Sequence, residues 1–227
     1  MTVTTDSSNN NNNAAPLPAS TAALLDLARL RRSIYTLSPT SPIPDAQLRQ
    51  LVEHAVTHMP SGFNTQSSRV VLLLHDEHKK LWRGVVRGIF EGMVERGEVP
   101  REVWEGQTRG KLESFERGYG TILFFEDPTH IAPMSEKFPI YKDGFPQWAQ
   151  HTNAIHQYFL WLALHSVGLG ANLQHYNPLI DEAVIKSWSL PTHWKLTAQM
   201  VFGTPAAEAG EKTFKPLEER VKVFGAQ

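Results

Sequence analysis

Cysteine is absent from this chain of 227 residues. Its absence excludes disulfide scaffolds, cysteine nucleophiles, iron–sulfur clusters and thiolate zinc sites. An excess of charge is missing as well, because 22 Lys and Arg stand against 23 Asp and Glu, for a formal net charge of −1. Binding to nucleic acid in general, or to an anionic membrane surface, needs a basic surplus. We therefore expect neither kind of partner.

Long apolar runs are also missing. The longest spans residues 158–164, only seven residues (YFLWLAL), whereas a membrane helix needs about 20. The amino terminus has neither the basic start nor the apolar segment of a signal peptide. These features predict a soluble protein without membrane insertion, located in the cytoplasm, with the nucleus also open.

The composition divides the chain into a short tail and one domain. Residues 1–19 are rich in Asn, Ser, Thr, Ala and Pro and offer almost nothing to bury, so they predict a disordered tail. Residues 20–227 have the size of a single domain, and apolar residues make up 41% of the whole chain, enough for a sizeable core.

The spacing of apolar residues predicts long helices separated by short, widely spaced strands. The expected helices cover residues 21–33, 45–59, 76–96, 100–117, 146–167 and 178–188. The expected strands cover residues 69–75, 120–125, 171–176 and 196–202. This pattern favours an α+β fold with helices around a small sheet. A GxGxxG or GxxxxGK[ST] motif is not found, which argues against a Rossmann or P-loop nucleotide site.

Arg31, Arg32 and Ser33 follow one another at the end of the first expected helix. Two guanidinium groups and a hydroxyl suit a phosphate, because arginine binds it with two parallel hydrogen bonds and stays charged. The simpler interpretation is a cationic last turn that complements the helix dipole.

Two loops could hold a flat ligand. Residues 60–66 (PSGFNTQ) carry amide side chains that can read the edge of a planar heterocycle, although an ordinary turn is the simpler interpretation. Residues 168–176 (GLGANLQHY) place small residues after an apolar helix, where backbone could approach a ligand closely. Here the alternative is a plain helix stop followed by a strand.

A metal-dependent or serine hydrolase is the competing hypothesis from the remaining side chains. His54 and His58 stand four residues apart and could face one ion from a single helix. However, Glu53 precedes His54, so the HExxH arrangement is not formed, and no GxSxG motif is present.

In this order, the segments resemble the FMN-dependent nitroreductase family, within its subgroup of fatty-acid-repression type. The resemblance covers about residues 20–224. It is carried by residues 31–35 (RRSIY), 60–66 (PSGFNTQ), 118–127 (GYGTILFFED), 168–176 (GLGANLQHY) and 212–220 (KTFKPLEER).

The resemblance implies a nitroreductase-like fold, in which helices surround a small, mostly antiparallel sheet and residues 20–227 form one FMN-binding domain with an extended C-terminal segment. It also implies an intertwined homodimer with an FMN at each of two interfaces. The implied activity is reduction of nitroaromatics, quinones or similar acceptors by NADH or NADPH, in a ping-pong cycle of hydride transfer at flavin N5. Since the flavin carries this chemistry, no side chain is expected to be catalytic.

The resemblance also assigns positions around the cofactor. Arg31 and Ser33 would hold the FMN phosphate and ribityl end, while the backbone at His175 and Tyr176 would face N5. Lys111 would lie near N1 by positional match. The remaining implied cofactor-binding residues are Arg32, Tyr35, Ser61, Asn64, Gln66, Gln174 and Lys212.

The chain departs from the family pattern at the flavin edge. Tyr35 stands where many relatives have a basic residue, and His175–Tyr176 replaces a frequent Gly-Gly pair. Phe214 replaces a second C-terminal cation, which Lys215 could supply instead. These changes leave an alternative open, namely a flavin-binding regulatory protein, responsive to lipid or stress, with the same fold and little turnover.

Overall fold

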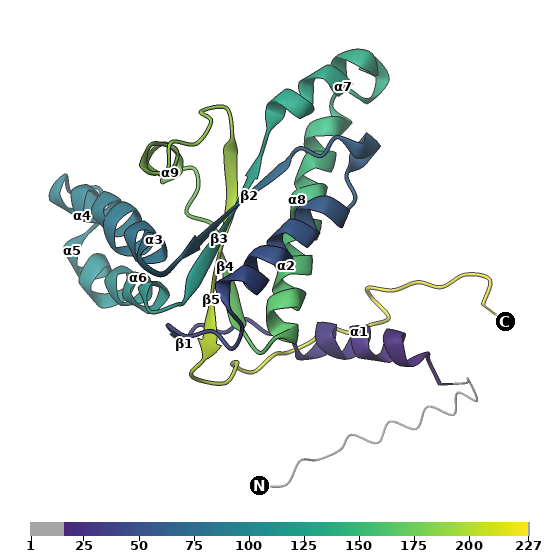
Figure 1. Cartoon of the computed structure of the whole chain (residues 1–227), viewed down its shortest axis with the longest axis horizontal. Helices are drawn as coiled ribbons and strands as arrows, with labels where there is room; N and C mark the ends of the chain where they lie inside the picture. Colours follow the sequence, from purple (N-terminus) through teal and green to yellow (C-terminus); the bar gives the residue numbers. More distant parts are fainter. Residues whose placement is uncertain (1–15, 227) are drawn as a thin grey trace, which may run out of the picture.

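The computed structural model describes residues 16–226, so residues 1–15 of the predicted tail lie outside the described residues. Five antiparallel strands form the sheet: β1 (Leu37–Ser38), β2 (Ser68–Leu74), β3 (Gly120–Glu126), β4 (Gly170–Gln174) and β5 (Lys195–Pro205). Strand β5 is central, because it pairs with β3 and β4 and, at its end, with β1. Strand β2 completes the sheet beyond β3 (Figure 1).

Helices cover both faces of the sheet (Figure 1). One face carries α2 (Asp45–His58) and α8 (Gly144–Ser166), with α1 (Ala19–Leu30) at the end of α8. The other face carries α3 (His75–Lys79), α4 (Arg87–Glu95), α5 (Arg101–Val103) and α6 (Arg109–Glu116), joined by the π-helical turns η2 (Lys80–Val86) and η3 (Trp104–Thr108). The remaining elements are η1 (Gly62–Asn64), η4 (Pro128–His130), α7 (Ala132–Lys137), η5 (Pro139–Tyr141) and α9 (Asp181–Ser187).

Strand β3 shows why the sheet is buried on both faces. Its residues are apolar without interruption from Ile122 to Phe125, and successive side chains of a strand point to opposite faces. Ile122 and Phe124 therefore pack with Leu160 of α8. Leu123 and Phe125 pack in the second core, beneath the helices of the other face. A continuous apolar run thus serves two cores at once.

The predicted α+β class and the mostly antiparallel sheet are confirmed. The predicted helix over 76–96 is interrupted, because η2 widens its middle into π-helical turns. Sequence spacing missed β1 and α7, which are too short to show a period. Within residues 16–226, no helix has the length and apolar character needed to cross a membrane.

Gly203 marks the tightest backbone contact in the sheet. A Cβ atom there would lie 2.4 Å from the Ser38 carbonyl oxygen and 3.1 Å from the Tyr119 nitrogen, both of them backbone atoms. We expect Gly203→Ala to lower the free energy of unfolding by about 2–3 kcal/mol, measured in urea. Gly88→Ala in α4 is the matched control, since its Cβ would meet nothing within 4 Å and should leave stability unchanged or slightly raised. Equal stability of the two variants would contradict the packing described for β1.

Candidate functional site

Arg31 lies in a position that favours the binding of an anion. It ends α1 in an extended conformation, and its guanidinium lies 4.3 Å from the ring centroid of Trp161 on α8. The Nε atom of Arg31 and the Nε1 atom of Trp161 are both buried without a hydrogen-bond partner among the described residues. Buried donors without acceptors are costly, so this pair of N–H groups fits a ligand that supplies acceptor oxygens.

A cleft of about 630 Å³ opens beside this arginine, between the ends of α1 and α8 and the start of β4. Arg32 lines it and donates a hydrogen bond to the Gly210 carbonyl, which holds the C-terminal segment against the cleft. His165, one helical turn after Trp161, also lines it. Burial, and then the Arg31 cation, lower the pKa of His165 below its ordinary value.

Ser33 and its neighbour attach the chain after α1 to the outer edge of β4. Ser33 forms a parallel bridge with Ala171, and the Ile34 N–H donates to the Ala171 carbonyl at 3.0 Å. The Asn172 side chain donates to the Ile34 carbonyl at 2.8 Å. The structure thus places the arginine pair beside the glycine-flanked strand.

The two backbone N–H donors predicted at the end of β4, those of His175 and Tyr176, differ in their surroundings. The Tyr176 N–H is used within the chain, because it donates to Gln199 Oε1 at 2.8 Å. His175 directly follows β4 and is exposed. Because the Tyr176 N–H is used within the chain, we expect the His175 N–H to be the predicted donor that remains for a ligand.

Two side chains predicted around this strand face the interior. The phenol of Tyr176 packs edge-on against Trp82 and Phe90, and its burial raises the pKa of that phenol to about 12. Gln174 is buried and donates to Asn172 Oδ1 at 2.8 Å. Both side chains therefore shape β4 from within.

Residues 60–66 form both the turn and a cavity wall. The Gln66 N–H donates to Ser61 Oγ at 3.0 Å and closes the turn, in which Phe63, Asn64 and Gln66 adopt positive φ angles. Asn64 and Gln66 are exposed. Together with Ser61 they line a cavity of about 620 Å³ that also contains His156 of α8.

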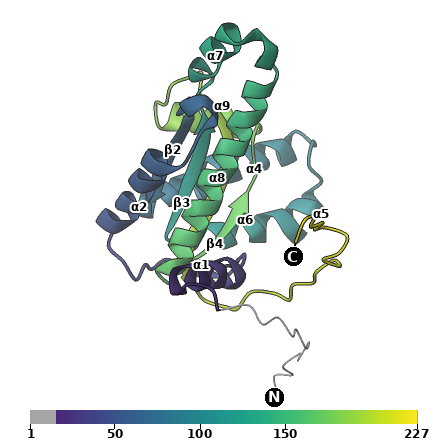
Figure 2. The same ribbon diagram turned by 90° about the vertical axis from the view of Figure 1, so that its right-hand side faces the viewer.

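These two groups of predicted residues lie at opposite ends of α8 (Figure 2). The turn is placed by Gly62, whose added Cβ would lie 3.3 Å from Trp148 near the start of the helix. Arg31 instead packs on Trp161, thirteen residues further along α8. At a rise of 1.5 Å per residue this separation is about 20 Å. One chain therefore does not bring the two groups together.

The remaining predicted cofactor-binding residues, Lys212, Lys111 and Tyr35, lie on different parts of the fold. Lys212 is exposed in the C-terminal segment, two residues beyond the Gly210 carbonyl that Arg32 holds. Lys111 is exposed on α6, in the helical layer on the opposite face of the sheet from α8. Tyr35 is exposed shortly after Ser33. The fold of one chain thus leaves Lys111 on the other side of the sheet from α8.

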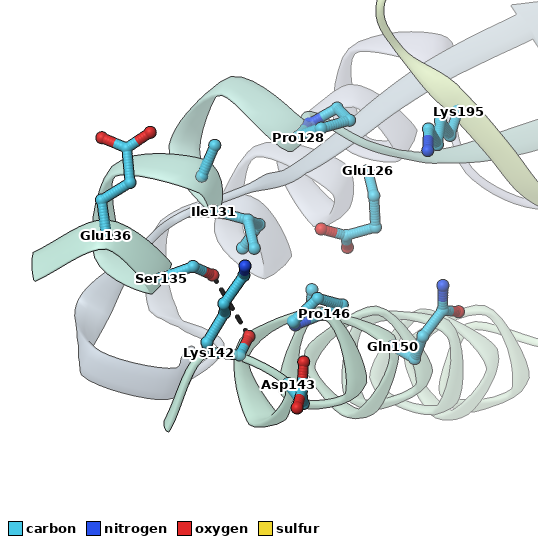
Figure 3. Close-up of a pocket in the computed structure, with 12 residues that line it drawn as sticks. Glu126, Pro128, Ile131, Ser135, Glu136, Lys142, Asp143, Pro146, Gln150 and Lys195 are labelled. Atoms are coloured by element: carbon cyan, nitrogen blue, oxygen red, sulfur yellow. Dashed lines mark hydrogen bonds between the residues drawn. The ribbon is translucent and has the colours of Figure 1, made fainter. Parts of the chain in front are cut away.

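A further cavity of about 520 Å³ lies between α7 and the start of α8 (Figure 3). Its buried carboxylate, Glu126, accepts hydrogen bonds from Ser67, Ser68 and Asn153 at 2.6–2.9 Å. Since the protein already satisfies this carboxylate, its role is to fix the strand that follows the 60–66 turn.

Among residues 16–226, no group of three or more potential ligands could hold a metal ion. His54 and His58 are exposed on α2 with ring centroids 4.4 Å apart. Sequence reasoning missed Trp161 and His165, which lie in the most apolar helix of the chain. Their spacing of four residues on one helix face was the available signal.

The fold is α+β, and a cationic cleft lies at the edge of its sheet. Buried donors beside this cleft lack acceptors among the described residues, so the site suits a phosphate-bearing ligand.

A model of the Nitroreductase family matches residues 28–204. The chain is 35% identical to the HBN1 protein of Saccharomyces cerevisiae, over 91% of this chain and 99% of that protein. It is 32% identical to the nitroreductase FRM2 of the same yeast, over 81% and 89% of the two chains.

A solved structure shows the same relationship. The nitroreductase CinD from Lactococcus lactis, in complex with nicotinic acid, is 40% identical with a TM-score of 0.80, over 88% of this chain and 99% of that one. The chain belongs to the Nitroreductase family, and is thus an oxidoreductase. The family and fold predicted from its sequence are confirmed.

Proposed function

We propose that this protein is an FMN-dependent oxidoreductase that uses NADH or NADPH to reduce nitroaromatics, quinones or similar acceptors. The observation that carries the proposal is the unpartnered pair of buried donors, Arg31 Nε and Trp161 Nε1, beside the start of β4. A phosphate would supply the acceptors that these donors lack, and a flavin edge would suit the backbone N–H of the exposed residue His175.

The residues beside the cleft suit the phosphate end of FMN. Arg31, Arg32 and Ser33 would hold the phosphate and ribityl end, and Lys212 follows the segment that Arg32 already fixes. When bound, FMN supplies reversible hydride chemistry at N5. The protein would bind the phosphate and orient the ring beside β4. Tyr35 brings a hydroxyl and no charge to the ring edge, so it does not favour the reduced, anionic flavin as a cation would.

A homodimer completes the site in this proposal. If two copies pair with their α8 helices antiparallel, the 60–66 turn of each chain comes to the Arg31 end of the other. The exposed apolar side chains Ile155 and Tyr158 on α8 support this pairing. So does the segment over residues 206–226, which runs away from the sheet with Phe214 and Phe224 exposed (Figure 1). Ser61, Asn64 and Gln66 would then meet the ring edge from the partner.

Nitroaromatic acceptors are supported by the relatives. CinD has been solved in complex with chloramphenicol, at 39% identity to this chain, and with 4-nitrophenol, at 38% identity. The turnover test is oxidation of NADH or NADPH by the FMN-loaded protein, with and without a nitroaromatic or a quinone.

We expect acceptor-dependent turnover, with parallel lines in double-reciprocal plots as the mark of a ping-pong cycle. FMN retention without turnover on any acceptor would instead favour the regulatory alternative. A requirement for added metal would point to a different chemistry.

A further inference from the structure

We propose that His165 is a third, titratable cation of the phosphate site, so that protonation of its imidazole tightens the binding of a phosphate monoester. This inference rests on the proposed function, with the FMN phosphate as the ligand. It assigns to α8 a role in binding the cofactor, in addition to its role in the core.

The geometry places His165 with the other donors. It stands four residues after Trp161, so the two side chains share a face of α8. It lines the same cleft as Arg32, and Arg31 acts on it electrostatically. Its ring makes no hydrogen bond within the described part of the chain, although the residue is half-buried. Its ring nitrogens are therefore open to a ligand in this cleft.

The charged groups around His165 determine its response to a ligand. Arg31 and Arg32, at the end of α1, oppose its protonation, while Glu208, on the C-terminal segment, and the C-terminal end of the α8 dipole favour it. Without a ligand, burial and Arg31 hold its pKa below the ordinary value of 6.5. A phosphate dianion in the cleft adds opposite charge and raises that pKa.

The sign of the pH dependence follows from this difference. The bound form holds a proton on His165 that the free form has lost near neutral pH, so binding takes up a proton. Affinity is then highest at low pH and falls as pH rises through the raised pKa of the complex. By linkage, the factor gained in affinity equals the factor by which phosphate raises the protonation constant of His165.

Equilibrium dialysis of the full-length protein against FMN or riboflavin tests this proposal. Measurements at about pH 6.5 and about pH 8.5 keep the phosphate largely dianionic, because its second pKa is about 6. For the wild type we expect FMN affinity to be about fivefold or more higher at the lower pH. Riboflavin lacks the phosphate, so its affinity should not change with pH.

Two substitutions and one control assign the effect to this side chain. His165→Gln should remove the pH dependence of FMN affinity, and His165→Lys, which stays charged, should bind tightly at both pH values. His151→Gln is the control, because it removes an exposed histidine of the same helix, fourteen residues earlier. It should behave as the wild type.

The outcomes separate this inference from the proposed function. A wild type that binds FMN, and a His165→Gln variant that keeps the same affinity and pH dependence, would overturn the role of His165 alone. A pH effect that is equal for riboflavin would overturn it too, since the phosphate would not be involved. A wild type that binds no FMN at either pH would overturn the proposed function and this inference together.

Discussion

Arg31→Glu is expected to purify without FMN. The substitution removes the buried guanidinium on Trp161 and sets a carboxylate against the phosphate. Each hydrogen bond between charged groups contributes about 1.5–3 kcal/mol, so losing two of them lowers FMN affinity by at least about a hundredfold. Repulsion between the new carboxylate and the phosphate adds to the loss. The ratio of flavin to protein, read from absorbance, measures the effect.

Arg29→Glu is the matched control for that substitution. Arg29 lies on the same helix and is exposed, and among residues 16–226 its one ion pair is with Asp26 on the surface. The same change of charge there should leave FMN content at the wild-type level, because a surface pair of this kind contributes little. If Arg31→Glu were folded and held FMN as the wild type does, the phosphate would have to bind elsewhere.

The second large effect is expected at the exposed apolar face of α8. Ile155→Asp should convert the protein to a monomer without FMN, because the carboxylate would be buried at the proposed helix pairing in both subunits. The dissociation constant of the dimer should rise by at least about a hundredfold, which corresponds to about 3 kcal/mol. Sedimentation velocity, with absorbance in the flavin bands, follows assembly and cofactor in one experiment.

Val103→Asp provides the comparison for Ile155→Asp. Both side chains are 41% exposed in the chain, but Val103 lies on α5, in the layer on the other face of the sheet. The Val103→Asp variant should therefore remain a dimer that carries FMN. An Ile155→Asp variant that stays dimeric and yellow would show that the subunits meet on another surface.

The sequence predicted the elements that have an internal pattern. The apolar run of β3 was recognisable because burial on both faces of the sheet leaves no polar position from Ile122 to Phe125. Helix α8 was recognisable from its length and from the large apolar residues in its second half. Strand β1 was not recognisable, since its two residues become a strand only by pairing with β5, more than 160 positions away. Such pairing depends on the tertiary fold and leaves no local signal.

The charged residues of the candidate site were predictable from the sequence, but their contacts and hydrogen bonds were not. Adjacent arginines pointed to a phosphate, whereas the aromatic support under Arg31 became visible only where α1 ends against α8. The Tyr176 N–H was a natural candidate from its position, but it donates its hydrogen bond to Gln199, on another strand. The separation of the two half-sites along α8 likewise needed the fold, because a linear sequence does not show which end of a helix a loop reaches.

The absorbance spectrum of the purified protein, followed by heat release of its chromophore, tests directly whether the protein carries FMN. We expect two flavin bands in the near-ultraviolet and visible range and the release of about one FMN per chain, because each chain has, among residues 16–226, one site with buried, unpartnered donors. A colourless protein that also takes up no added FMN would contradict this expectation. The fold would then remain that of a nitroreductase, but the cleft at Arg31 would serve another anion.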